Sequence, residues 1–239
     1  MKVSVLFPYR KSNDSRRERN FAYTLRHYGL LTDYCSLKIV VADDPDPNTF
    51  NRGRALHEAY LQTESDADVL IFADGDLIVP INRLLDGVAL VHSQIEKVGY
   101  VVPFSQVDYL TDDATELVIN QNVSIAYDFS YKEYWKNRST GGINILTPKA
   151  YEQSGGFDPR FLEWGFEDAA FDAQMQTLVG PCVWLDGPSY HLYHHSSRRG
   201  GSPQFKQSMF LCDKYRSYMN HEGLMKSIIT EAPRNWEKK

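Results

Sequence analysis

The first 95 residues alternate between short apolar segments and helix-like segments, and this alternation is the feature that most limits the fold. Three runs have the apolar, β-branched character of buried strands, and a stretch with helical spacing follows each of them. Strands that alternate with helices form a mostly parallel sheet covered on both faces, so we expect an α/β protein. The expected strands are Val3–Phe7, Leu37–Ala42 and Val69–Ala73, and the expected helices are Ser15–Tyr28, Asn51–Gln62 and Arg83–Ile95.

Charged residues come directly after these strands. In α/β sheets, ligands collect at the carboxyl ends of the strands. The very apolar strand Val69–Ala73 is followed by Asp74-Gly75-Asp76, which places two carboxylates one residue apart. A divalent cation is the obvious partner for them, because hard oxygen ligands suit Mg²⁺ or Mn²⁺, ions that usually share their coordination with substrate phosphates. The tripeptide alone is a weak signal, and its position after a buried strand makes it a candidate metal site.

A histidine cluster provides further candidate ligands. His191, His194 and His195 lie within five residues of one another. Imidazole is a common ligand of Mn²⁺ and Zn²⁺. In an extended chain, His191 and His195 would lie on one face and His194 on the other, so the three could not bind one ion without a turn. A packed or solvent-exposed histidine cluster is the alternative interpretation.

Glu167 and Asp168 stand at the start of a predicted helix, Glu167–Leu178. The helix dipole favours anions at that end, so a carboxylate there would remain ionised and could accept a proton from an attacking hydroxyl. The alternative is that both acids only cap the helix.

The chain after Pro103 is less regular. We expect an acidic, turn-like segment over Asp108–Glu116, a break at Ser139–Gly142 and an apolar run at Ile143–Leu146. A short helix is expected over Pro148–Ser154, closed by two glycines. Ser196–Pro203 is the most loop-like stretch.

Composition excludes several classes of protein. With 239 residues, 42% of them hydrophobic, the chain is long enough for one large domain or two fused halves. The longest apolar run, Val69–Ala73, is far shorter than the roughly 20 residues of a membrane-spanning helix. A formal charge of −5 argues against bulk binding of nucleic acid. The three cysteines, without a paired spacing, fit a reducing compartment.

Two stretches of the chain are locally basic and suggest a small anionic ligand such as a phosphate. They are Arg10–Arg26 and the stretch between Asp186 and Asp213.

Five motifs, taken together and in order, resemble those of the GT-A-fold glycosyltransferases. They are Phe50-Asn51-Arg52, Val69 to Ile78, Gly141-Gly142-Ile143-Asn144, Gly155-Gly156-Phe157-Asp158 and Trp164-Gly165-Phe166-Glu167-Asp168. The chain is most similar to the β-1,4-galactosyltransferases and to the related chondroitin-polymerase and polypeptide N-acetylgalactosaminyltransferase groups. The resemblance implies a Rossmann-like, mostly parallel sheet flanked by helices in a single GT-A-like domain, 1–239. Residues 1–105 would form the half that binds the nucleotide sugar, and residues 106–239 the half with the acceptor and catalytic residues.

The resemblance also implies roles for individual residues. The donor, a nucleotide sugar and most plausibly a UDP-sugar, would be bound by Pro8, Arg10, Asp43, Phe50, Arg52, Asp74 and Gly142. Gly141 and Trp164 would contact the acceptor, which could be a glycan, a protein or a lipid-linked sugar. Asp76, His194 and His191 would bind Mn²⁺, or Mg²⁺. Asp168 would be the catalytic base, and Glu167 would bind a sugar hydroxyl.

The chain departs from this pattern at certain positions. It has Ser12 where the galactosyltransferases carry a second arginine, so Arg16 or Arg17 could supply that phosphate contact. His191 stands where the galactosyltransferases have a methionine. Glu167-Asp168 replaces the Glu-Asn of the retaining, polypeptide-directed group, which favours inversion. Because the stem and anchor of the Golgi enzymes are not found, we expect a cytoplasmic protein in a bacterial or viral context.

The interpretation that these features favour is a metal-dependent, inverting glycosyltransferase. A retaining transferase of the same fold, for example in protein O-glycosylation, is the nearest alternative. A nucleotidyltransferase is less favoured, because Pro8–Ser12 lacks the glycine-rich loop of such enzymes. A non-catalytic carbohydrate-binding module would require Glu167 and Asp168 to be caps only. We also expect Ser196–Pro203 to close over the bound donor as a lid, with a solvated loop without a role as the alternative.

The second half also contains a group of aromatic residues. They could form a platform for a glycan, but packing within the second half is what we expect for most of them. These residues are Tyr109, Tyr127, Tyr131, Tyr134 and Trp135.

Overall fold

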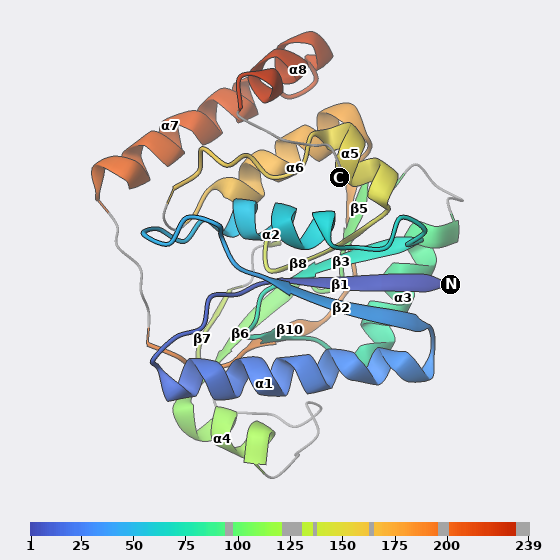
Figure 1. Cartoon of the computed structure of the whole chain (residues 1–239), viewed down its shortest axis with the longest axis vertical. Helices are drawn as coiled ribbons and strands as arrows, with labels where there is room; N and C mark the ends of the chain where they lie inside the picture. Colours follow the sequence, from blue (N-terminus) through green and yellow to red (C-terminus); the bar gives the residue numbers. More distant parts are fainter. Residues whose placement is uncertain (94–97, 121–130, 136–137, 163–164, 196–200, 233–239) are drawn as a thin grey trace.

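A six-stranded sheet forms the centre of the protein in the computed structural model, which describes residues 1–93, 98–120, 131–135, 138–162, 165–195 and 201–232 (Figure 1). The order of its strands is β2-β1-β3-β8-β5-β9. They span β1 Lys2–Pro8, β2 Ser36–Ala42, β3 Val69–Ala73, β5 Tyr100–Val102, β8 Ile143–Leu146 and β9 Cys182–Trp184. β8 is antiparallel to its neighbours β3 and β5, and the other pairings are parallel. The predicted mostly parallel sheet is therefore confirmed, with strands from both halves of the sequence.

A second sheet, of four strands in the order β4-β10-β6-β7, lies beside the first. Its strands are β4 Leu77–Ile78, β6 Gln106–Leu110, β7 Tyr131–Trp135 and β10 Pro188–His191. β4 follows the Asp74–Asp76 turn directly and pairs with β10, so that Leu77 lies opposite His191. This pairing brings two segments more than 100 residues apart in the sequence to the same place.

The expectation of a turn-like segment at Asp108–Glu116 is wrong. Residues 106–110 form β6, and residues 112–120 form a helix, α4. Val107 and Leu110 are buried, which the sheet requires, and Asp112 and Asp113 occupy the first helical turn, where the dipole favours acids. The acidic residues are thus explained by the start of a helix.

Helices cover both faces of the main sheet (Figure 1), with α1 and α2 on opposite sides of it. Side-chain caps begin several of them: Asp14 accepts from the Arg16 amide, Asn51 from the Arg54 amide and Thr147 from the Ala150 amide. Gly155 ends α5 in the left-handed conformation, as expected. The helices are α1 Ser15–Gly29, α2 Arg52–Leu61, α3 Ile81–Ser93, α4 Asp112–Asn120, α5 Pro148–Ser154, α6 Glu167–Leu178, α7 Pro203–Ser217 and α8 Glu222–Thr230, and a 3₁₀ turn spans Leu30–Asp33.

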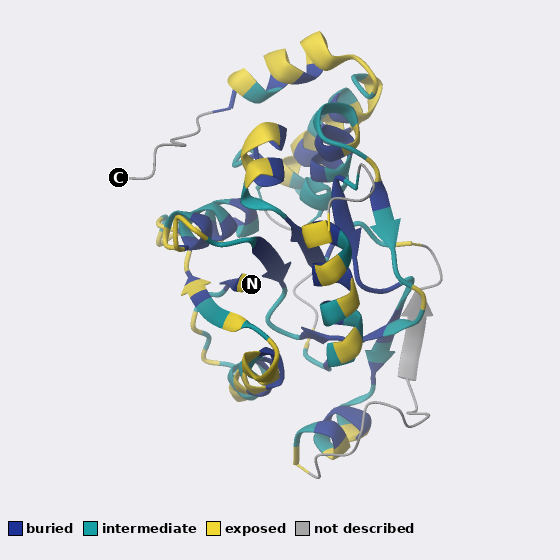
Figure 2. Ribbon diagram, turned by 90° about the vertical axis from the view of Figure 1, so that its right-hand side faces the viewer, coloured by how far each residue is buried: buried dark blue, intermediate teal, exposed yellow. Residues whose placement is uncertain are grey.

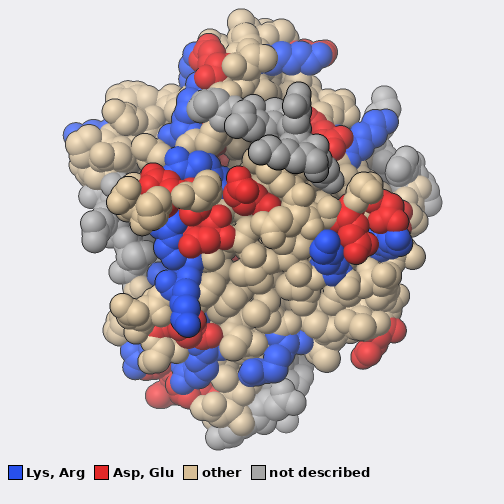
Figure 3. Space-filling model, viewed as in Figure 1, with Lys and Arg blue, Asp and Glu red and all other residues tan. Residues whose placement is uncertain are grey.

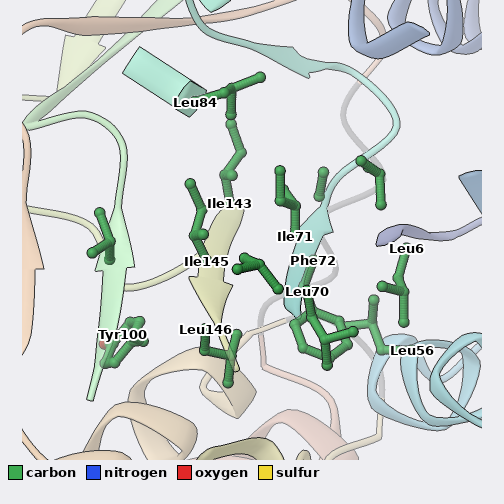
Figure 4. Packing of buried hydrophobic residues seen from close by; sticks show 14 of the residues in the cluster. Leu6, Leu56, Leu70, Ile71, Phe72, Leu84, Tyr100, Ile143, Ile145 and Leu146 are labelled. Carbon is green, nitrogen blue, oxygen red and sulfur yellow. The ribbon is translucent and has the colours of Figure 1, made fainter. Parts of the chain in front are cut away.

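The core is centred on β3, where every residue is fully buried (Figures 2 and 4). Phe72 packs among aromatic rings from α5 and the following loop, and Leu56 and Leu84 approach from α2 and α3. α6, α7 and α8 share a separate cluster that includes Ala170, Cys212 and Met225. Within the part of the chain that the structure describes, no helix has the length and apolar character needed to cross a membrane.

The Gly99 position gives a test of this packing. A Cβ atom at Gly99 would lie 2.2 Å from the carbonyl oxygen of Gly180, so Gly99→Ala must displace backbone beside β5 and β9. We expect it to lower the free energy of unfolding by about 1–3 kcal/mol in urea denaturation. Gly29→Ala is the matched control, because no atom lies within 4 Å of its added Cβ, and it should be neutral or stabilising. Equal stability of both variants would contradict the described packing.

Candidate active site

The turn Asp74-Gly75-Asp76 connects β3 to β4 at the carboxyl edge of the main sheet. A Cβ atom at Gly75 would lie 2.8 Å from Cδ2 of Phe21, whose ring stacks on Tyr9 with centroids 3.7 Å apart. Glycine is therefore needed for the turn to pack this closely against α1. The Asp74 amide donates to the Gly142 carbonyl at 2.8 Å, and the Asp76 carbonyl accepts from the Leu192 amide at 2.8 Å. The turn is thus held on both sides by the second half of the sequence.

Asp76, His191 and His194 form a group of potential metal ligands on one side of this turn. Their ligand atoms all lie within 4.8 Å of one another. Nε2 of His194 is 3.0 Å from Asp76 Oδ2, and Nε2 of His191 is 3.7 Å from Asp76 Oδ1. The three residues predicted to bind the metal are therefore brought together.

The end of β10 makes this arrangement possible. The strand ends at His191, residues 192–195 have no regular secondary structure, and His194 lies against Asp76 although an extended chain would place it on the opposite face from His191. The next residue points elsewhere, because Nε2 of His195 lies 2.9 Å from Nη1 of Arg16. His195 is thus engaged outside the group.

Hydrogen bonds orient both imidazoles toward Asp76. Nδ1 of His191 lies 3.1 Å from the Leu192 carbonyl, and Nδ1 of His194 lies 2.9 Å from the His195 carbonyl. Burial acts to raise the pKa of Asp76, but the charges of protonated His191 and His194 and the hydrogen bond from His194 outweigh it and hold the value at about 2, so the carboxylate is ionised. A bound cation would replace those protons: with each Nδ1 donating to its carbonyl, each Nε2 would offer its lone pair to the metal.

This donor set fits a first-row transition ion. One carboxylate oxygen and two imidazole nitrogens suit Mn²⁺, whereas Mg²⁺ prefers oxygen ligands and retained waters.

Arg52 lies at the centre of an ionic cluster on the other side of the turn. Its Nε donates to Asp74 Oδ1 at 2.7 Å, and its Nη1 donates to Asp168 Oδ1 at 2.8 Å. Glu167 Oε1 is 3.8 Å from the same Nη1. Three carboxylates therefore share one guanidinium, and burial, partly offset by Arg52, raises the pKa of Asp74 to about 6.

Two atoms of this cluster are ready to receive a ligand. Nη2 of Arg52 and Oε2 of Glu167 are buried and have no hydrogen-bond partner among the described residues. Burial and the nearby Asp168 carboxylate raise the pKa of Glu167 above its usual range. Buried polar atoms of native proteins are nearly always paired, so an open donor beside an open acceptor indicates a polar ligand.

The two glycines of the Gly141-Gly142 motif leave room for these acids. A Cβ atom at Gly141 would lie 2.0 Å from Asp168 Oδ2, so no larger residue fits. Gly142 has a φ of 91°, and a Cβ there would lie 2.5 Å from Cδ2 of Leu77. Glycine at both positions lets this segment pass directly beside Asp168 and the metal-side turn.

A third group of predicted residues lies at the ends of β1 and β2. Pro8 ends β1, and Arg10 follows it. Arg10 Nε donates to Asp43 Oδ1 at 2.8 Å. The Arg10 guanidinium also lies over the Phe50 ring, with Cζ 5.6 Å from the ring centroid. The guanidinium also donates to the carbonyls of Asp44, Asp46 and Thr49, so it fixes the 43–49 loop, and a contact of Arg10 with the donor stays a prediction. Figure 3 shows interleaved acidic and basic side chains over the region where this loop lies.

Some predicted residues lie outside the described part of the chain, and one important residue was missed. Trp164, Tyr127 and residues 196–200 of the expected lid are among the residues that are not described. Asn51 was named only within a motif. It caps α2, and its Nδ2 donates to the carbonyls of Pro159 and Phe161, so it ties Arg52 to the segment that leads to Glu167. An asparagine at the start of a predicted helix is a capping signal, so the helix could have been begun at Arg52 and the first role of Asn51 identified.

Metal binding can be measured without any assumption about activity. We expect the protein to bind one Mn²⁺ in isothermal titration calorimetry, and Asp76→Ala and His194→Ala each to weaken the affinity by at least about 100-fold, since each removes a ligand. His195→Ala is the matched control and should bind like the unmodified protein, because His195 lies in the same segment but contacts Arg16. Unchanged affinity in the first two variants would contradict the assignment.

Comparison with known proteins gives one family match. The family described as the N-terminal domain of galactosyltransferase matches residues 121–195, which include Gly141, Glu167, Asp168, His191 and His194. A comparison with curated proteins finds no match.

Solved structures provide further similarity. The chain is similar to a mutant of Drosophila beta-1,4-galactosyltransferase 7 in complex with manganese, UDP-Gal and xylobiose, with 15% identity, a TM-score of 0.57 and coverage of 87% of this chain and 79% of that one. For GalNAc-T7 with UDP, GalNAc and Mn²⁺ the identity is 13%, the TM-score 0.54 and the coverage 96% and 54%. For mannosyl-3-phosphoglycerate synthase from Rubrobacter xylanophilus these values are 14%, 0.54, 90% and 73%. The chain therefore has the GT-A glycosyltransferase fold and resembles the galactosyltransferase group, as the sequence motifs indicate.

Proposed function

We propose that the protein is a Mn²⁺-dependent glycosyltransferase that moves a sugar from a UDP-sugar donor to an acceptor hydroxyl with inversion of the anomeric centre. The observation that carries this proposal is the turn at Asp74–Asp76. It has three metal-ligand side chains on one side and, on the other, a carboxylate at a helix start that is fixed by Arg52.

Asp76, His191 and His194 would hold the metal ion. When bound, Mn²⁺ supplies positive charge that stabilises a diphosphate leaving group. The solved structures of the Drosophila enzyme and of GalNAc-T7 contain manganese with UDP-Gal or UDP, which supports the same donor class here.

Asp168 is the residue that we assign as the catalytic base. Arg52 donates to its Oδ1, which fixes the carboxylate. Its other oxygen, Oδ2, packs against the backbone at Gly141, where a Cβ atom would lie only 2.0 Å away. An acceptor hydroxyl that approached Oδ2 could transfer its proton there, the arrangement that general-base catalysis needs.

The open atoms of Arg52 and Glu167 suit the hydroxyl groups of the transferred sugar. A hydroxyl both donates and accepts, so one sugar hydroxyl could satisfy Oε2 of Glu167 and another Nη2 of Arg52. Gly142, next to the metal-side turn, would allow close approach of the donor.

The nucleotide end of the donor is assigned to the loops after β1 and β2. Asp43 and the exposed ring of Phe50 are available there, with Arg10 as the residue that fixes the loop. Pro8, which is buried at the end of β1, is assigned to the donor site only because the resemblance implies it. Asp74 would support the ribose, and Trp164 would contact the acceptor, as the resemblance implies. Residues 1–105 would thus serve mainly the donor and residues 106–239 the acceptor.

Retention of configuration is the nearest alternative. The position of Asp168 in the first turn of α6, with its carboxylate fixed by Arg52, supports a base and hence inversion. A binding module without catalysis would release no nucleotide from a donor.

The experiment that tests the proposal is a screen of nucleotide sugars with the purified protein. We expect Mn²⁺-dependent release of UDP from one or more UDP-sugars, and proton NMR of the first-formed product should show the anomeric configuration opposite to that of the donor. Release of no nucleotide from any donor would contradict the transferase proposal, and a retained configuration would contradict the role of Asp168.

Substitution of Asp168 gives a sharper test of that role. Asp168→Asn keeps the size of the side chain but removes its ability to accept a proton, so we expect the turnover rate to fall by roughly 10²–10⁴-fold with little change in UDP affinity. Asp113→Asn is the matched control, because Asp113 is also an acid in the first turn of a helix but lies on α4, and it should keep full activity. A large loss for Glu167→Gln but none for Asp168→Asn would mean that the two roles are exchanged.

A further inference from the structure

Arg138, three residues before Gly141, carries a guanidinium group that has no acidic partner among the described residues. Arg138 is exposed, and its Cζ lies 5.3 Å from the centroid of the Trp184 ring. Stacking on an aromatic ring holds a guanidinium in place while its N–H groups remain free to donate. Among the described residues, Arg138 forms no ion pair, whereas Arg52, Arg10 and Arg54 are each paired with carboxylates.

Trp184 is a rigid support for this group. It is the last residue of β9 and lies opposite Val102 in the main sheet, and its partly buried side chain packs against the main core. Its Nε1 donates to the Ser139 carbonyl at 2.8 Å. β8 is antiparallel to both β3 and β5, and β9 is parallel to β5, so β9 and β3 run in the same direction. Their carboxyl ends therefore lie at the same edge of the sheet, which places Trp184 at the edge where Asp74 lies.

The Ser139–Gly141 segment connects this support to Asp168. The Gly141 amide donates to Ser139 Oγ at 3.2 Å, and Asn144 Nδ2 donates to the Thr140 carbonyl at 2.8 Å, so the segment has a fixed shape. Gly141 in turn lies against Asp168 Oδ2. Three residues of extended chain span at most about 10 Å, so the Arg138 backbone lies within about that distance of Gly141, the residue against which the proposed base packs.

We propose that Arg138, stacked on Trp184, binds an anionic group of the acceptor, a carboxylate or a phosphate carried on or next to the sugar whose hydroxyl is glycosylated. The inference rests on the proposed function, because it concerns the acceptor of that reaction. The proposed site contains Asp74, Glu167 and Asp168, whose carboxylates repel an anion. A cation that forms no ion pair with any described residue is therefore the feature that would allow an acidic acceptor to bind, and a guanidinium matches carboxylate and phosphate with two parallel hydrogen bonds.

The test compares charged and neutral acceptor probes in binding and not in turnover. In the presence of Mn²⁺ and UDP, the affinities of p-nitrophenyl β-glucoside, its 6-phosphate and p-nitrophenyl β-glucuronide are measured by ligand-observed NMR. We expect at least one anionic probe to bind roughly three- to tenfold more tightly than the glucoside, and this preference to shrink at high salt. Whether the glucuronide or the phosphate gains more distinguishes the two anionic groups.

Two variants assign the preference to Arg138. Arg138→Gln should abolish it, and Arg26→Gln should not, because Arg26 also stacks on an aromatic ring, Tyr23, but lies in the last turn of α1. Equal affinity of charged and neutral probes, no binding of any probe, or a preference that persists in Arg138→Gln would overturn the inference. Release of UDP from donor by the unmodified protein is measured separately, so failure of the transferase proposal is distinguished from failure of this one.

Discussion

The site depends on the cost of placing carboxylates at the end of a fully buried strand. β3 delivers Asp74 and Asp76 to the sheet edge, and neither acid has a cationic neighbour on its own strand. Charge compensation comes instead from elsewhere in the chain: Arg52 from α2 for Asp74, and His191 and His194 from the end of β10 for Asp76. Asp74 and Asp76 are themselves only partly buried, so the loss of a partner costs less than the about 3–5 kcal/mol of a fully buried pair, but these contacts still hold distant segments together as well as preparing the chemistry.

The two sides of the turn differ in how well their charges are balanced. Around Asp76, two imidazoles keep the carboxylate ionised and turn their Nε2 atoms toward it. Around Arg52, three carboxylates compete for one guanidinium, and polar atoms of Arg52 and Glu167 remain open. In the proposed function, a cation would complete the first arrangement, and hydroxyl groups of a sugar would complete the second. This difference is the physical basis for placing the metal and the sugar on opposite sides of Asp74–Asp76.

Sequence patterns predicted the strands and helices of the first half closely, because Val69–Ala73 and its neighbours are apolar runs separated by clear caps and turns. They failed at Asp108–Glu116, where acidic residues that begin α4 and a strand of the second sheet were interpreted as a turn. The convergence of Asp76, His191 and His194 was predicted only through the resemblance, since strand pairing between β4 and β10 is not visible in local spacing. The Arg138–Trp184 contact was not predicted for the same reason: it depends on a tertiary contact with Ser139.

The central claim is that one turn joins a metal-bound diphosphate to a sugar held beside Asp168. A crystal structure of the protein grown with Mn²⁺ and UDP, with anomalous scattering from manganese, tests this claim most directly. The account predicts one strong manganese peak within ligand distance of Asp76, His191 and His194, with oxygens of the UDP diphosphate completing its coordination on the side that faces Arg52. A manganese peak elsewhere, or UDP bound away from the metal, would contradict it.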